Sequence, residues 1–114
     1  MPDRVLAITR IHGIAGRRDE LRALMRATEA AVAEEPGCMT YRFAATLDDP
    51  DEYVHVQEWA GEDGWRAHQR SPAFREYQRS LFDLLARPSD MEIHRGAETT
   101  RPEPSAQLDP RAAD

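Results

Sequence analysis

Three side chains able to do chemistry alternate along one predicted strand. They are His55, Gln57 and Trp59, and every second side chain of a strand points to the same face. An imidazole transfers protons near neutral pH, an amide hydrogen-bonds, and an indole offers a flat wall to an aromatic ligand. If this face meets helices, the three side chains form a semi-polar pocket, which we favour. If it faces a partner sheet, His55 and Gln57 are hydrogen-bonding interface residues and Trp59 closes the core.

Two arginines and two tyrosines add further candidates. Arg42 and Arg10 lie in predicted strands, where a guanidinium can stabilise a phenolate or superoxide by its charge. The alternative for both is ordinary ion pairing with the many carboxylates of this chain. Tyr41 and Tyr77 can hydrogen-bond a substrate carbonyl, or they can fill the core, because both lie on apolar faces.

The pattern of the metal-binding residue types argues against metal chemistry. The four histidines, His12, His55, His68 and His94, show no ligand spacing such as His-x-x-x-His, so we predict no metal site and no cofactor. The single Cys38 can form neither an internal disulfide nor a Cys-rich zinc site, which favours a reducing cytoplasm. All 15 basic residues are arginine, and without lysine the chain has neither Schiff-base chemistry nor a P-loop.

Length and charge exclude several classes of protein. The chain has 114 residues, a formal charge of −6 and 40% apolar residues, which is typical of one globular domain. An acidic chain is a poor ligand for phosphate backbones, so nucleic acid is not an expected partner. No run approaches the roughly 18 apolar residues that span a bilayer, and we expect neither a membrane partner nor a secretory signal.

Periodicity and turn signals predict seven elements in the order β-α-β-β-α-α-β. The predicted strands are residues 5–11, 39–47, 53–59 and 91–95, and the predicted helices are residues 17–35, 62–69 and 71–86. Alternation puts Met39 and Tyr41 on the same face of the second strand. The last helix has Ser71 as its N-cap and Pro72 at its first helical position, and Phe82 belongs to its inward stripe. Right-handed crossovers turn this order into an α+β ferredoxin-like fold, with a four-stranded antiparallel sheet and helices on one face.

The first strand is apolar on both faces, which predicts that both faces of the sheet are covered. The simplest cover for the second face is another copy of the chain, sheet against sheet, so we expect a homodimer. The predicted domain covers residues 1–95. Residues 96–114 form a Pro-rich C-terminal tail that cannot bury enough surface to order itself.

Short motifs in this chain resemble the antibiotic biosynthesis monooxygenase superfamily of small dimeric α+β barrels. They are the segment Gly37-Cys38-Met39-Thr40-Tyr41, the strand end Glu58-Trp59, His68 on the short helix, and Ser71 followed by Phe74 at the start of the next helix. The resemblance covers about residues 4–95. It implies a ferredoxin-like subunit that pairs with a second subunit into a dimeric barrel.

The resemblance also implies an activity. Monooxygenases of this superfamily oxidise polycyclic phenols or quinols to quinones without metal or flavin, and the deprotonated substrate itself reduces dioxygen. By this reading His68 is the catalytic base, Trp59 and Trp65 are aromatic walls, and Arg42 stabilises the anion. The alternatives are a histidine that packs on Ser71 at the helix surface, and tryptophans that belong to the core.

Two departures from the family pattern narrow the range of activities that the resemblance implies. The haem-degrading branch uses an Asn, a Trp and a His at positions that correspond to Thr9, His68 and Gln78, so haem degradation is not expected. Some monooxygenase relatives place an Asn near the reacting oxygen, and this chain contains no Asn. Gln57, a tyrosine or Arg42 would have to replace that donor.

Taken together, these features predict a dimeric, cofactor-independent monooxygenase that acts on a hydroxylated aromatic or quinol with O2. The expected substrate-binding residues are Tyr41, His55, Gln57, Trp59, Trp65 and Tyr77, with His68 and Arg42 as catalytic residues. Two alternatives remain open at this point: an isomerase or cyclase that uses the same pocket, and a dimer that binds a small ligand without catalysis.

Overall fold

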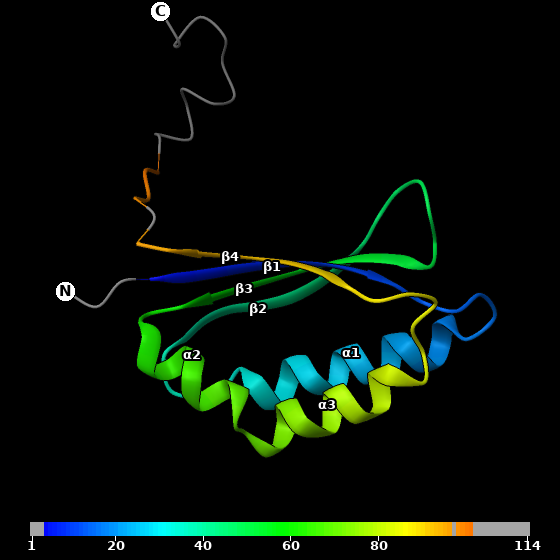
Figure 1. The fold of residues 1–114 in the computed structure, drawn as a ribbon, viewed down its shortest axis with the longest axis horizontal. Coiled ribbons are helices and arrows are strands. Elements are labelled where there is room, and N and C mark those ends of the chain that lie inside the picture. Colours follow the sequence, from blue (N-terminus) through cyan, green and yellow to red (C-terminus); the bar gives the residue numbers. More distant parts are fainter. Residues whose placement is uncertain (1–3, 97, 102–114) are drawn as a thin grey trace, which may run out of the picture.

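The computed structural model describes residues 4–96 and 98–101, which form one sheet with three helices on one of its faces (Figure 1). The strands are β1 (Val5–His12), β2 (Cys38–Ala45), β3 (Glu52–Trp59) and β4 (Asp90–Arg95). They lie in the order β2-β3-β1-β4, and every neighbouring pair is antiparallel. The predicted element order and the four-stranded antiparallel sheet are therefore confirmed. Residues 102–114 of the predicted tail lie outside the described residues.

The helices are α1 (Arg18–Val32), α2 (Glu62–Gln69) and α3 (Pro72–Phe82). Each buries one stripe of side chains at helical spacing, as Leu21, Met25, Thr28 and Val32 do on α1. In the described part of the chain, no helix combines the length and the apolar character that crossing a membrane requires.

Two predicted helix ends are wrong by several residues. α1 ends at Val32 rather than at residue 35, and α3 ends at Phe82 rather than at residue 86. The residues after α3 bond to the end of β1 instead of continuing the helix: Ile14 N–H donates to Leu84 O at 2.9 Å, and Ala86 N–H donates to His12 O at 2.8 Å. Phe82, which the stripe placed inward, is the last residue of α3 and is 79% exposed.

An irregularity at the start of β2 changes which side chains face the helices. The pairing with β3 shifts between Cys38 and Thr40, so that Met39 falls in a bulge. The simple alternation placed Met39 on the same face as Tyr41, but Met39 is 49% exposed whereas Tyr41 is buried. The bulge therefore separates them and directs Tyr41 toward the helical layer.

α2 lies unusually close to the end of β3 because Gly64 has no side chain. A Cβ atom at Gly64 would lie 3.0 Å from Pro36 O and 3.3 Å from the Trp59 ring. This close approach brings Trp65 and His68 of α2 into the core beside Trp59, where both are buried.

α3 begins with the cap that its sequence predicts. Ser71 is the N-cap, Pro72 occupies the first turn, and the Ser71 Oγ accepts a hydrogen bond from Phe74 N–H at 3.2 Å. This bond holds the first turn of α3, so it sets the position of Phe74 above the sheet.

Replacing Ser71 with alanine leaves the Phe74 N–H without its capping acceptor. We expect the Ser71→Ala variant to lose about 1 kcal/mol of unfolding free energy, measured by urea denaturation. Ser80→Ala, inside α3, is the matched control and should not lose stability. Equal stability of Ser71→Ala and the unmodified chain would contradict the capping role.

Candidate functional site

A cavity of about 260 Å³ lies between the sheet and α3. The side chains that line it include Thr9, His55, Gln57, Phe74, Tyr77 and Leu81. Small-molecule sites usually measure roughly 300–1,000 Å³, so this cavity suits a compact ligand. It lies on the helix-covered face of β3, where His55 and Gln57 line it and Trp59 does not.

His55 brings an imidazole to the cavity wall. Its side chain is buried, and its ring stacks on Phe43 with centroids 3.9 Å apart and an angle of 8°. The edge of Tyr41 packs against it at 4.4 Å. Burial, together with the nearby His68, lowers the pKa of His55 to about 3. The ring is therefore neutral at physiological pH.

Three buried polar atoms on residues of this cavity wall have no hydrogen-bond partner within the described structure: Thr9 Oγ1, His55 Nε2 and Ser89 Oγ. We call these three atoms the open polar atoms. Thr9 is the register partner of His55 across the β1–β3 pair, so two of them lie side by side. Because buried polar groups are normally paired, the open polar atoms leave hydrogen-bonding capacity unused on the residues around the cavity.

Gln57 lines the same cavity, and one end of its amide is already engaged. The indole Nε1–H of Trp59 donates to Gln57 Oε1 at 3.1 Å. An indole nitrogen is only a donor, so the amide oxygen must face Trp59. The NH2 group of Gln57 takes no part in this bond.

His68 lies behind the cavity wall, which corrects the expectation that its ring points into the cavity. The lining residues do not include it, and its side chain is 0% exposed. Its ring stacks on Trp59 at 4.8 Å, and its Nδ1 lies 2.9 Å from Glu35 Oε1. Burial lowers the pKa of His68, while the Glu35 carboxylate acts in the opposite direction. The close packing of α2 over Trp59 explains this enclosure.

The tyrosines and Trp65 divide between the cavity and the core. Tyr77 lines the cavity, and burial raises the pKa of its hydroxyl, which stays protonated. Tyr41 is buried one layer behind, between the rings of His55 and His68. Trp65 belongs to the apolar cluster that also contains Trp59, and neither is part of the cavity lining.

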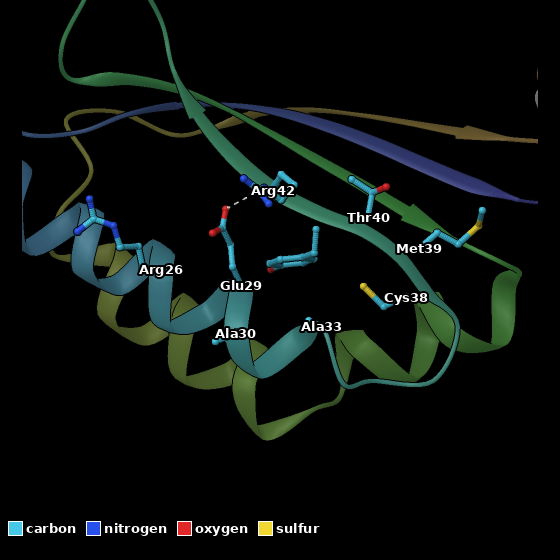
Figure 2. Close-up of a pocket in the computed structure, with 9 residues that line it drawn as sticks. Arg26, Glu29, Ala30, Ala33, Cys38, Met39, Thr40 and Arg42 are labelled. Atoms are coloured by element: carbon cyan, nitrogen blue, oxygen red, sulfur yellow. Dashed lines mark ion pairs between the residues drawn. The ribbon is translucent and has the colours of Figure 1, made fainter. Parts of the chain in front are cut away.

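Arg42 lies outside the cavity, in a groove of about 550 Å³ between α1 and β2 (Figure 2). Its side chain is 78% exposed, and its Nε lies 3.9 Å from Glu29 Oε2. The same carboxylate accepts the Phe43 N–H at 2.8 Å. The expectation that Arg42 stabilises an anion in the pocket is therefore corrected, and its ion-pairing alternative is what the structure contains. Strand alternation places Arg42 on one face of β2 and its neighbours Tyr41 and Phe43 on the other face, so Arg42 points away from the cavity.

Sequence reasoning missed several cavity residues. Ser89, Met91 and Leu85 come from the segment after α3, and nothing in their spacing links them to His55. Thr9 could have been found, because it alternates with Ile11 on β1, but its face was undetermined until the strand pairing was known.

Within the described residues, no group of three or more His, Cys, Asp or Glu side chains is arranged to hold a metal ion. The cavity is lined by one neutral imidazole, the two amides of Gln57 and Gln78, hydroxyl groups, aromatic rings and aliphatic side chains. These groups can accept a proton and hydrogen-bond an anion.

The fold and site define a ferredoxin-like α+β protein with a small pocket between its sheet and helices. The sequence pattern of the family described as Antibiotic biosynthesis monooxygenase matches residues 4–80. The chain belongs to the antibiotic biosynthesis monooxygenase family, as its motifs predicted.

Solved structures and one curated relative extend this comparison. SnoaB, a cofactor-independent oxygenase from Streptomyces nogalater, is 25% identical with a TM-score of 0.76, covering 89% of this chain and 99% of that one. Rv0793 from Mycobacterium tuberculosis is 25% identical with a TM-score of 0.77, covering 88% and 99%. The uncharacterized protein sll1783 of Synechocystis is 28% identical over 83 residues, which are 73% of this chain and 56% of that protein. The chain therefore spans little more than half the length of this curated relative.

The neutral burial of His55 predicts a loss of stability in acid. Its folded pKa of about 3 lies below the ordinary value of 6.5, so as pH falls the unfolded chain takes up the proton first. The stability is present above about pH 6.5 and is lost toward pH 3. Between pH 7 and pH 5 this one group should account for a loss of about 2 kcal/mol.

Urea denaturation at both pH values measures this effect. The His55→Gln variant should lose less stability between pH 7 and pH 5 than the unmodified chain. His94→Gln, at an exposed histidine of β4, should lose as much as the unmodified chain. A His55→Gln variant with the full pH dependence would show that His55 is not buried as a neutral ring.

Proposed function

We propose that this protein is a cofactor-independent monooxygenase that oxidises a compact hydroxylated aromatic or quinol to a quinone with O2. The observation that supports this most directly is a pocket with aromatic walls and open polar atoms, one of them on an imidazole. Membership of the family and the similarity to SnoaB agree with it. We further propose that the protein acts in the cytoplasm on a small molecule.

In this proposal His55 takes the part of the base that the sequence assigned to His68. It lines the cavity, and its ring is neutral before the substrate binds because burial holds its pKa at about 3. A phenol bound in the cavity beside the His55 ring can donate its proton to that ring. The resulting phenolate lies next to the imidazolium. The attraction between these two opposite charges raises the pKa of the ring once the proton has been transferred.

The oxidation then proceeds on the substrate itself. The phenolate transfers one electron to O2, and the resulting superoxide and aryl radical combine to form a C–O bond to a ring carbon. The hydroperoxide loses water: its O–O bond breaks, the ring C–H proton leaves, and one oxygen remains as the quinone carbonyl. The two hydrogens of the water come from the phenol O–H and the ring C–H, so no external reductant is required.

Gln57 supplies the anion-stabilising donor in place of the missing asparagine. Its NH2 group is the end of the amide that Trp59 leaves free, and it borders the cavity. A donor fixed in advance stabilises developing negative charge strongly in a water-poor site. Phenolate and superoxide are both suitable acceptors.

The outer face of the sheet, opposite the helices, supports a homodimer. Its centre is the partly exposed apolar group Leu6, Ile8, Val54 and Val56 on β1 and β3. An apolar strip on the centre of a sheet is best covered by another sheet. We propose that a second copy of the chain packs here.

Oxygen uptake tests the proposed activity. Purified protein with one- and two-ring quinols should consume O2 faster than boiled protein, and His55→Gln should lower kcat about 100-fold. His94→Gln is the matched control and should keep full activity. Turnover without O2 consumption would instead indicate an isomerase or cyclase, and binding without turnover would indicate a ligand-binding protein.

Light scattering after size-exclusion chromatography tests the dimer. The unmodified chain should have twice its mass of 13.0 kDa. Placing a charge at the centre of the outer face, with Ile8→Glu, should shift the protein toward the single-chain mass. A monomeric unmodified chain at micromolar concentration would contradict the proposed dimer.

A further inference from the structure

We propose that Trp59 is a positioning residue, which turns the amide of Gln57 so that its NH2 group faces the cavity. This inference rests on the proposed function, because it assigns a task to the donor that the oxidation requires. It gives Trp59 a role different from the aromatic wall that the sequence predicted.

The direct contact is the hydrogen bond from Trp59 Nε1–H to Gln57 Oε1 at 3.1 Å. A glutamine amide has two ends of opposite hydrogen-bonding character, and it can rotate to exchange them. Without the indole, either end can face the cavity. With the indole present, the amide loses its hydrogen bond to Trp59 if it turns its carbonyl oxygen toward the cavity. In that orientation the carbonyl oxygen would also repel a phenolate.

Trp59 is itself rigidly held. It is 0% exposed, and as the last residue of β3 it pairs with Val5 on one side and Cys38 on the other. The absence of a side chain at Gly64 lets α2 contact the ring directly. A donor on such a fixed ring selects one orientation of its acceptor.

A second ring holds the indole from the helical side. The His68 imidazole stacks on Trp59 with centroids 4.8 Å apart and an angle of 27°. His68 is held in turn by Glu35, whose Oε1 lies 2.9 Å from Nδ1. A carboxylate only accepts hydrogen bonds, so this contact fixes the proton of the neutral ring on Nδ1. The buried histidine that the sequence proposed as the base thus acts on the cavity through Trp59 and Gln57.

Trp59→Phe tests the inference, because it keeps an aromatic ring and removes the N–H. Removing one oxyanion donor typically lowers kcat by a factor on the order of 10²–10³. A donor that is kept but can rotate should lower kcat less, by about tenfold. We expect kcat to fall about tenfold with little change in KM. Trp65→Phe, in the same buried cluster, is the matched control and should keep its kcat.

A double mutant separates positioning from packing. In a Gln57→Leu background, adding Trp59→Phe should lower kcat no further, because the amide that Trp59 orients is already gone. A further tenfold loss there, or an equal loss in Trp65→Phe, would show that Trp59 acts only through packing and would overturn the inference.

A second measurement does not depend on any activity. The chain has two tryptophans, so the ¹H–¹⁵N spectrum contains two indole N–H signals, which the two Phe variants assign. Gln57→Leu should move the Trp59 indole signal and leave that of Trp65 in place. If the unmodified protein consumes no O2, the proposed oxidation is contradicted, but the shift of the Trp59 signal still tests the bond between Trp59 and Gln57. An unmoved Trp59 signal overturns the inference.

Discussion

The structure depends on how a sheet buries a row of polar side chains. β3 directs His55, Gln57 and Trp59 toward the helices, where each polar atom loses its contact with water. Such atoms destabilise a fold unless they find partners. Here the row is only partly satisfied, by the bond between Trp59 and Gln57. The remaining hydrogen-bonding capacity of His55 and Gln57 lies on residues that line a cavity.

The two buried histidines show how environment separates two identical side chains. His68 has a carboxylate partner and is enclosed by rings, whereas His55 lines the cavity with its Nε2 among the open polar atoms. Burial lowers the pKa of both, so neither carries a charge into the apolar interior at neutral pH. One ring is therefore suited to hold its neighbours in place, and the other is suited to meet a substrate.

The helical layer determines how close these groups can come. Gly64 lets α2 pack against Trp59, and the Ser71 cap starts α3 where Phe74 reaches the cavity. The charged groups remain at the edge: Arg42 pairs with Glu29 beside β2 rather than entering the site. The described lining of the cavity contains no Asp, Glu or Arg side chain, which suits chemistry in which the substrate, and not the protein, carries the developing charge.

The sequence by itself determined the order of elements, the sheet, the Ser71 cap and the family, because these follow from local periodicity, turn residues and short motifs. It also placed His55, Gln57 and Trp59 on one face, since strand alternation is a local property. Only the tertiary structure decided which histidine meets the cavity. That choice depends on the distance between α2 and the sheet, and on contacts between residues such as Glu35 and His68 that lie 33 positions apart. Periodicity describes directions within one element, whereas a cavity is defined by the gaps between elements.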